Sequence, residues 1–342
     1  MTRWRNLLNG GAAAAIAGLS LIALKNAPGD AAHRLVNVSY DPTRELYQAL
    51  NPLFVAAYEK ETGRHIVIAQ SHGGSSRQAR RIVSGEQPAD VVTLGLFTDV
   101  DGLRKRGLIA PNWVDRLPNR SSPYTSTIVF VVRRGNPHHV RDWPNLLAPG
   151  LEVVTPDPRT SGNGKLAALA AWAAVVTRGG NDDEARAYLQ SLYQHVPALE
   201  EGARGAAISF AIQEIGDVHL TWENEALREV ADSNGKLEIV YPPVSILAEP
   251  YVAWVDAAVA RDGELDDARA YLGFLFSDEA QETIARLGYR PYKPYAARKA
   301  GVAFHPLTLA PITDIARDWD DANEKFFAEN GVIDLIIGSR RK

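Results

Sequence analysis

The chain has 342 residues, a length that favours two domains over one, since a typical domain has roughly 150 residues. Hydrophobic residues make up 46% of it and charged residues 23%, which is the composition of a globular protein. Its 37 basic and 41 acidic side chains give a net charge of −4, which excludes the basic surface that nucleic-acid binding requires. The absence of cysteine excludes disulfides, Cys-ligated metals and thiolate catalysis.

The first residues indicate export. Arg3 and Arg5 precede an apolar run at 10–24, which is short for a membrane span and has the length of the apolar core of a signal peptide. We expect residues 1–31 to be a signal peptide or an N-terminal anchor. The rest of the chain would then lie outside the cytoplasm, in the periplasm.

From residue 35 onward, short β-branched segments alternate with longer amphipathic ones, the pattern of an α/β fold with largely parallel strands. Strands are predicted at 35–39, 65–69, 91–94, 126–132, 152–155, 219–221 and 237–240. Helices are predicted at 42–62, 165–177, 182–193, 206–214, 265–276 and 279–287. The extended stretches 125–132 and 246–254 would carry the chain to a second domain and back, which makes the first domain discontinuous.

Four junctions carry small or acidic residues where a helix would follow a strand or loop. The first N–H groups of a helix have no acceptor within it and lie at the positive end of its dipole, so they can bind an anion. Each junction alone is equally well explained as a capped helix or a glycine-rich turn. In chain order they are Asp41-Pro42, Gly73-Gly74-Ser75-Ser76, Ser161-Gly162-Asn163-Gly164-Lys165 and Gly202-Ala203-Arg204-Gly205.

Three further residues near these junctions are assigned roles. Trp222 follows the strand predicted at 219–221 and would offer one indole N–H, although a tryptophan in that position is more often part of the core. Asp90 and Arg204 are expected to form an internal ion pair. The third junction is not a nucleotide-binding loop, because Leu166 follows Lys165 where that loop has serine or threonine.

Nothing in the sequence predicts catalysis. It contains no G-x-S-x-G elbow, no H-E-x-x-H motif and no closely spaced set of His, Asp and Glu. His138-His139 follows a proline in what reads as a solvated loop, and His72 has no visible acidic partner. We therefore expect a protein that is not an enzyme, with no catalytic residue, no metal and no cofactor.

Taken together, these segments resemble the periplasmic sulfate- and thiosulfate-binding proteins that feed ABC importers. The resemblance covers about residues 35–295. The segments that carry it are NVSYDPTRE (37–45), QSHGGS (70–75), ADVVTL (89–94), PYTSTIVF (123–130), GARG (202–205), WENEA (222–226), ILAEP (246–250) and YRP (289–291).

The resemblance implies an α/β, two-lobed periplasmic-binding-protein fold of type II, with the ligand cleft between lobes that hinge strands join. Lobe 1 would be discontinuous, formed by residues 32–122 and 249–330, and lobe 2 would be formed by 123–248. Residues 331–342 would be a C-terminal tail. The protein would act as a monomer that delivers sulfate, or thiosulfate as a second ligand, to the membrane permease subunits of an ABC importer.

Carried over position by position, the resemblance also implies a ligand-binding set. The ligand would be bound by Asp41, Ser75, Ser161, Gly162, Asn163, Ala203 and Trp222. Asp41, Gly162, Asn163 and Ala203 would give backbone N–H groups, and Ser75 would give both its N–H and its hydroxyl. The second lobe would also supply Ser161 and the indole N–H of Trp222. The family usually has a second glycine where this chain has Asn163.

Such a set of donors suits sulfate, which is fully ionised at neutral pH and presents only acceptors. The proton of hydrogen phosphate would meet no acceptor, at a cost of about 1–3 kcal/mol or more. We expect the Asp41 carboxylate to cap its own helix, because it would repel the dianion. Two alternatives stay open: a binding protein for another oxyanion, such as molybdate, tungstate or phosphate, and an anion-sensing adaptor.

Overall fold

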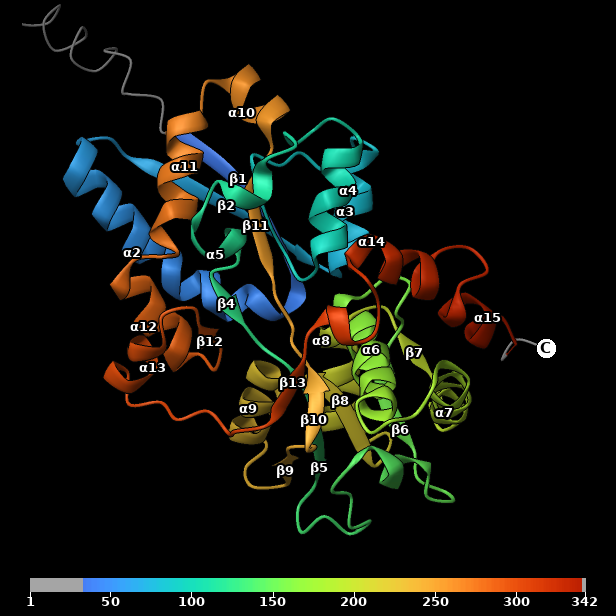
Figure 1. Ribbon diagram of the computed structural model, residues 1–342. Helices are drawn as coiled ribbons and strands as arrows, with labels where there is room; N and C mark the ends of the chain where they lie inside the picture. The colour runs from blue at the N-terminus through green and yellow to red at the C-terminus, as the bar shows by residue number, and fades with distance from the viewer. Residues whose placement is uncertain (1–32, 340–342) are drawn as a thin grey trace, which may run out of the picture.

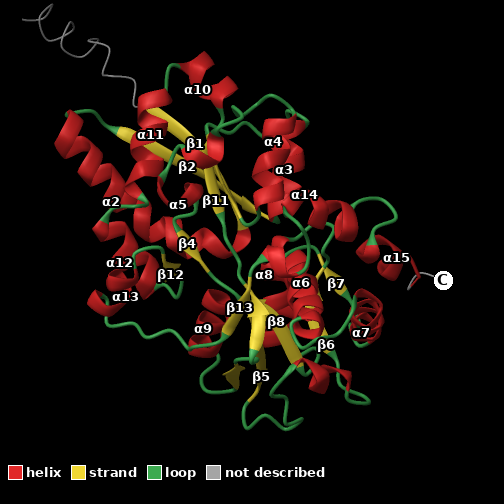
Figure 2. Cartoon of the chain, viewed as in Figure 1, coloured by secondary structure: helices red, strands yellow, loops and turns green. Residues whose placement is uncertain are grey.

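The computed structural model describes residues 33–339, so the leader predicted at 1–31 lies outside the described residues. The described chain forms two lobes, each built on a β-sheet with helices on its faces (Figures 1 and 2). This arrangement confirms the predicted two-lobed α/β fold. No helix between residues 33 and 339 is long and apolar enough to span a membrane.

Lobe 1 contains a four-stranded sheet in the order β11-β3-β1-β2, counted within the described chain. β1 pairs in parallel with β2 and β3, and β11 returns from lobe 2 to pair antiparallel with β3. The strands are β1 (His33–Tyr40), β2 (Ile66–Gly73), β3 (Val91–Leu94) and β11 (Tyr251–Trp254). The helices are α2 (Arg44–Thr62), α3 (Ser75–Val83), α4 (Phe97–Lys105), α5 (Pro118–Ser121), α10 (Asp256–Asp262), α11 (Leu265–Phe274), α12 (Asp278–Arg286) and α13 (Pro294–Lys299).

Helices cover both faces of the central strand β1. Leu35 packs into the cluster that α2, α11 and α12 form on one face of the sheet. Val38 points to the other face and packs with α3 and α4. The buried polar side chains of β1, Asn37 and Ser39, are tolerated because both are hydrogen-bonded to the Thr93 hydroxyl of the neighbouring strand β3.

Lobe 2 contains a five-stranded sheet in the order β7-β6-β8-β5-β9, again within residues 33–339. β6 is parallel to β7 and β8, whereas β5 is antiparallel to β8 and β9. The sheet is therefore mixed, and not largely parallel as predicted. The strands are β5 (Ile128–Arg133), β6 (Val153–Pro156), β7 (Leu199–Glu200), β8 (Val218–Trp222) and β9 (Leu237–Val240). The helices are α6 (Gly162–Val176), α7 (Asp182–Gln194), α8 (Ala203–Ala207), which continues into a π-turn at Ile208–Ile212, and α9 (Glu223–Asp232).

The hinge lies in the two stretches predicted as crossovers. Ser126 and Ala248 form an antiparallel bridge, in which each N–H donates to the other carbonyl at 2.9 and 3.0 Å. Beside it, β4 (Tyr124–Thr125) pairs with β12 (Arg290–Pro291) on the lobe 1 side. The lobes are thus joined by extended strands that can bend while each sheet keeps its pairing.

The C-terminal segment packs on a different lobe from the one expected from the sequence. Those boundaries placed 249–330 in lobe 1 and 331–342 in a tail. Instead, the chain crosses to lobe 2 once more and adds buried side chains to the core around α6 (Figure 1). The segment consists of β13 (Thr308–Ala310), which pairs with β10 (Val244–Ile246), and of α14 (Trp319–Ala322) and α15 (Val332–Ser339).

The C-terminal segment packs on lobe 2 because both the segment and helix α6 present apolar surface. Helix α6 is buried along 162–174, almost its whole length, so it needs cover beyond the sheet and α7. A helix that is apolar all round must be enclosed on all sides. The segment supplies that cover with side chains that a solvated tail would leave in water, among them Trp319, Phe326, Val332, Ile333, Ile336 and Ile337.

Candidate anion-binding site between the lobes

The seven residues implied by the sequence line one small cavity between the lobes. The empty space within it, open solvent included, is about 180 Å³. Asp41 and Ser75 reach it from lobe 1 and the other five from lobe 2, so the cavity is complete only when the lobes are in contact. Its walls are formed by Tyr40, Asp41, Pro42, Gly74, Ser75, Ser161, Gly162, Asn163, Ala203 and Trp222.

Helix starts surround this cavity. Backbone N–H groups in the first turn of a helix have no acceptor within that helix, and the helix dipole makes this end positive. An anion here would therefore meet partial positive charge from several directions, although no Lys, Arg or His lines the cavity within the described residues. The first residues of the 3₁₀ turn Asp41–Thr43, of α3, of α6 and of α8 are Asp41, Ser75, Gly162 and Ala203, and Asn163 is second in α6.

Trp222 is a buried residue of the cavity wall whose indole N–H has no acceptor among the described residues. Its side chain is fully buried, and Nε1 has no hydrogen-bond partner anywhere in the described chain. A buried donor without an acceptor costs about 1–3 kcal/mol. The ring packs against Tyr40 with centroids 5.4 Å apart, which holds the indole at the cavity wall. A ligand oxygen would remove the penalty.

The two serine hydroxyls are held differently. Ser75 Oγ donates to Asp99 Oδ2 at 2.6 Å and accepts from the Gly95 N–H at 3.0 Å. The hydroxyl therefore donates within lobe 1, and the Ser75 backbone N–H lies in the first turn of α3. Ser161 Oγ accepts a long hydrogen bond from the Gly164 N–H at 3.5 Å, which uses a lone pair and leaves its own proton for a ligand.

Asn163 fits the place where the family usually has glycine. It is not among the described residues with positive φ, so the backbone conformation does not require glycine. Its Nδ2 donates to the Leu220 carbonyl at 3.0 Å, which ties the side chain to β8. The amide side chain is thus held by lobe 2 itself, and the backbone N–H in the first turn of α6 is retained.

The Asp41 carboxylate does not cap its own helix, contrary to expectation. Asp41 is itself the first residue of the 3₁₀ turn, and no side chain caps this helix start. Instead, Oδ1 accepts from Arg44 Nη2 at 3.3 Å, one turn further along. Burial raises the pKa of Asp41, and Arg44 acts against that rise.

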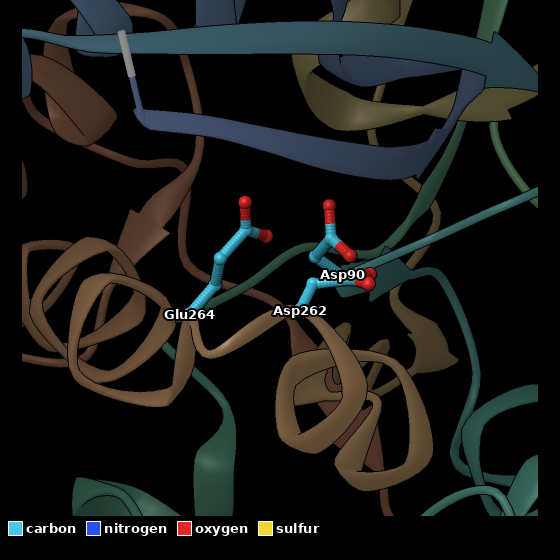
Figure 3. A group of neighbouring side chains, drawn as sticks. All are labelled: Asp90, Asp262 and Glu264. Carbon is cyan, nitrogen blue, oxygen red and sulfur yellow. The ribbon is translucent and has the colours of Figure 1, made fainter. Parts of the chain in front are cut away.

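The predicted ion pair between Asp90 and Arg204 is wrong. Arg204 Nη1 lies 3.3 Å from Glu45 Oε1, and Asp90 Oδ2 accepts from the Val36 N–H at 2.7 Å. Asp90 faces Asp262 and Glu264, whose carboxylate oxygens lie within 4.8 Å of one another (Figure 3). This cluster belongs to lobe 1, at the end of β1 that is remote from the cavity.

Sequence reasoning missed a charged contact beside the cavity. Lys165 Nζ lies 3.8 Å from Asp99 Oδ1, so a lobe 2 cation meets the lobe 1 carboxylate that also binds Ser75. Both side chains are almost completely buried. The available signal was a lysine inside an otherwise apolar helix, since a buried lysine needs a partner.

Fold and cavity together define a two-lobed binding protein, and comparison with known proteins gives its family. The chain belongs to the bacterial extracellular solute-binding proteins, whose family pattern matches residues 43–290. The sulfate-binding protein of Escherichia coli is 46% identical over 89% of this chain and 92% of its own. The thiosulfate-binding protein of Pseudomonas aeruginosa is 42% identical over 93% of this chain and 97% of its own.

A solved structure agrees with these relatives. The sulfate-binding protein SubI from Mycobacterium tuberculosis has a TM-score of 0.78 with this chain at 31% identity. The match covers 86% of this chain and 100% of that protein. The resemblance inferred from the sequence motifs is therefore confirmed at the level of the family.

Gly74→Ala tests whether the cavity depends on contact between the lobes. A Cβ at Gly74 would stand 2.6 Å from the Thr160 carbonyl oxygen of lobe 2, whereas the Gly74 φ of −56° suits alanine. We expect the variant to keep the unfolding temperature of the free protein and to bind sulfate, the ligand named in the Escherichia coli relative, at least about tenfold more weakly. Calorimetric titration measures the loss.

Gly102→Ala is the matched control, because a Cβ at Gly102 in α4 meets nothing within 4 Å. It should leave affinity unchanged. Equal affinities for the two variants would show that closure does not need the close approach at Gly74.

Glu264→Gln tests the carboxylate cluster. Burial, together with Asp90 and Asp262, raises the pKa of Glu264 from 4.5 to about 7 in the folded protein. Between those values the folded state holds a proton that the unfolded chain has released, so stability falls as the pH rises. The variant should lose less stability than the parent between pH 5 and pH 8, as measured by urea unfolding.

Glu61→Gln, an exposed change on α2, is the control and should leave the parent's pH dependence in place. A Glu264→Gln stability curve parallel to the parent's would contradict the assignment.

Proposed function

We propose that this protein captures sulfate in the periplasm, with thiosulfate as a second ligand, and delivers it as a monomer to the permease subunits of an ABC importer. Its role would be transport and not catalysis. The single observation that carries the proposal is the buried Trp222, whose indole N–H lacks an acceptor among the described residues and which lines the same cavity as four helix starts. The names of the relatives support the same ligands.

The donors suit an anion that has no proton of its own. Backbone N–H groups, the Ser161 hydroxyl and the Trp222 indole all donate, so a fully ionised tetrahedral oxyanion can satisfy them. The dipoles of several helices spread the compensating charge over the cavity wall. Hydrogen phosphate would bring a donor of its own, and its proton would compete with these N–H groups.

Closure would couple binding to transport. The lobe 1 donors and the lobe 2 donors reach the same anion only when the lobes meet, so the ligand would favour the closed state by binding it more tightly than the open one. The strands at the hinge allow such bending without breaking either sheet. The closed protein would then be the form that the permease recognises.

Titration with several anions tests the ligand class. Sulfate and thiosulfate should bind to the full chain without its leader, as measured by calorimetry at pH 8. Phosphate should bind at least about tenfold more weakly, since an unpaired proton in the cavity costs about 1–3 kcal/mol. Tighter binding of phosphate or molybdate than of sulfate would replace the proposal with a binding protein for that oxyanion.

Trp222→Phe tests the donor that carries the proposal. Removing one hydrogen bond to a charged ligand should weaken sulfate binding by about 10- to 100-fold, equivalent to about 1.5–3 kcal/mol. The control is Trp172→Phe in α6, which removes another buried indole N–H that has no partner in residues 33–339 but lies away from the cavity. An affinity equal to the parent's in Trp222→Phe would take this residue out of the site.

A further inference from the structure

A carboxylate at the mouth of the cleft joins the lobes through two arginines. Glu45 stands in the first turn of α2, in lobe 1. Its Oε1 accepts from Nη1 of Arg204 in α8 at 3.3 Å and from Nη1 of Arg228 in α9. Both arginines belong to lobe 2, so these contacts exist only in the closed arrangement.

Lobe 2 holds one of these arginines in place by itself. Arg228 Nη2 donates at 2.7 Å to Oε2 of Glu225, its neighbour three residues earlier in α9. Both residues belong to α9, so this pair would stay with lobe 2 when the lobes separate. Arg228 is therefore oriented for Glu45 before closure, and little side-chain ordering remains when the contact forms.

The position of the contact relates it to the cavity. Glu45 follows Asp41 by about one helical turn, and Arg204 directly follows Ala203. Asp41 and Ala203 line the cavity from opposite lobes, and each is the first residue of a helical segment. The lobes also meet beside them, because a Cβ on Gly202 would lie 2.6 Å from Asp41 Oδ2. Pairing of Glu45 with the arginines thus fixes how closely two of the ligand donors approach each other.

Other charged contacts between the lobes differ from this one in place or strength. Arg290 of β12 and Glu223 of α9 form a buried pair, with hydrogen bonds of 2.6 and 2.8 Å, but β12 lies beside the hinge. Arg77 and Glu201 pair at 2.5 Å, but the Glu201 side chain is 81% exposed, and exposed pairs contribute little. Lys165 and Asp99 are buried but 3.8 Å apart. The Glu45 side chain is 37% exposed and binds two cations, one of which is already oriented.

We propose that Glu45 is a positioning residue that latches the closed lobes through Arg204 and Arg228 and slows the release of the bound anion. The proposal rests on the proposed function, since it concerns the same cavity. It assigns Glu45 no contact with the anion. Its effect comes from the closed state alone, because the contact is absent when the lobes are apart.

Removing the charge of Glu45 should change the ligand affinity in opposite directions, depending on whether Glu45 acts as a latch or only as a nearby charge. Glu45 is negative and lies near a site for a dianion. If only Coulomb repulsion mattered, removing its charge would raise the affinity for the dianion. If it is a latch, its loss lowers affinity although a repulsive charge has been removed. Glu45→Gln keeps the size of the side chain and removes its charge, so it separates the two.

The test compares Glu45→Gln with the parent and with Glu201→Gln, which removes one negative charge from the exposed inter-lobe pair. Sulfate release is followed by stopped-flow Trp fluorescence after a chase, and affinity by calorimetry. We expect Glu45→Gln to release sulfate about 3- to 10-fold faster, with an association rate within twofold of the parent's. Glu201→Gln should stay close to the parent in both rates.

Two further measurements separate a latch from a structural role. The unfolding temperature of the ligand-free Glu45→Gln protein should match the parent's, whereas the increase produced by saturating sulfate should be smaller. Arg204→Gln should add little to Glu45→Gln, because both remove the same contact. A release rate equal to the parent's, or a higher affinity, in Glu45→Gln would overturn the latch. A parent that binds neither sulfate nor thiosulfate would overturn the proposed function, and the latch with it.

Discussion

Backbone N–H groups that helices leave without acceptors are the constraint around which both lobes are arranged. Such groups lie at helix starts, and in a parallel α/β unit a helix starts just after the carboxyl end of a strand. β1 and β2 lead to Asp41 and Ser75, and the parallel strands β6 and β7 lead to the starts of α6 and α8. The parallel part of each sheet thus directs its helix starts at the same cavity. The antiparallel strands β5, β9 and β11 supply crossovers and sheet edges.

When backbone N–H groups hold the anion, closure of the lobes depends on the placement of these groups more than on the net charge of the protein. The chain carries a net charge of −4, and no cation stands among the residues that line the cavity within 33–339. Charged side chains are placed around the cleft instead: Lys165 meets Asp99 beside it, and Glu45 meets Arg204 at its mouth. They govern how the lobes meet, and the N–H groups govern what fits between them.

The sequence predicted more of the site than of the packing. Local signals marked the junctions at Asp41, Ser75, Gly162 and Ala203, because small residues before a helix leave a trace in a short window. The partners of charged side chains left no such trace. The Asp90–Arg204 pair was wrong because residues on different elements become neighbours only through tertiary packing. The use of the Ser75 hydroxyl by Asp99 was missed for the same reason.

The C-terminal segment bears on the order in which the lobes can fold. The core of lobe 1 takes side chains as late as Tyr289, and the core of lobe 2 takes them as late as Ile337. Neither core can close until most of the chain has been made, although domains commonly fold in turn from the N-terminus during synthesis. Each lobe is therefore completed by contacts between segments far apart in the sequence, and such contacts form more slowly than local ones.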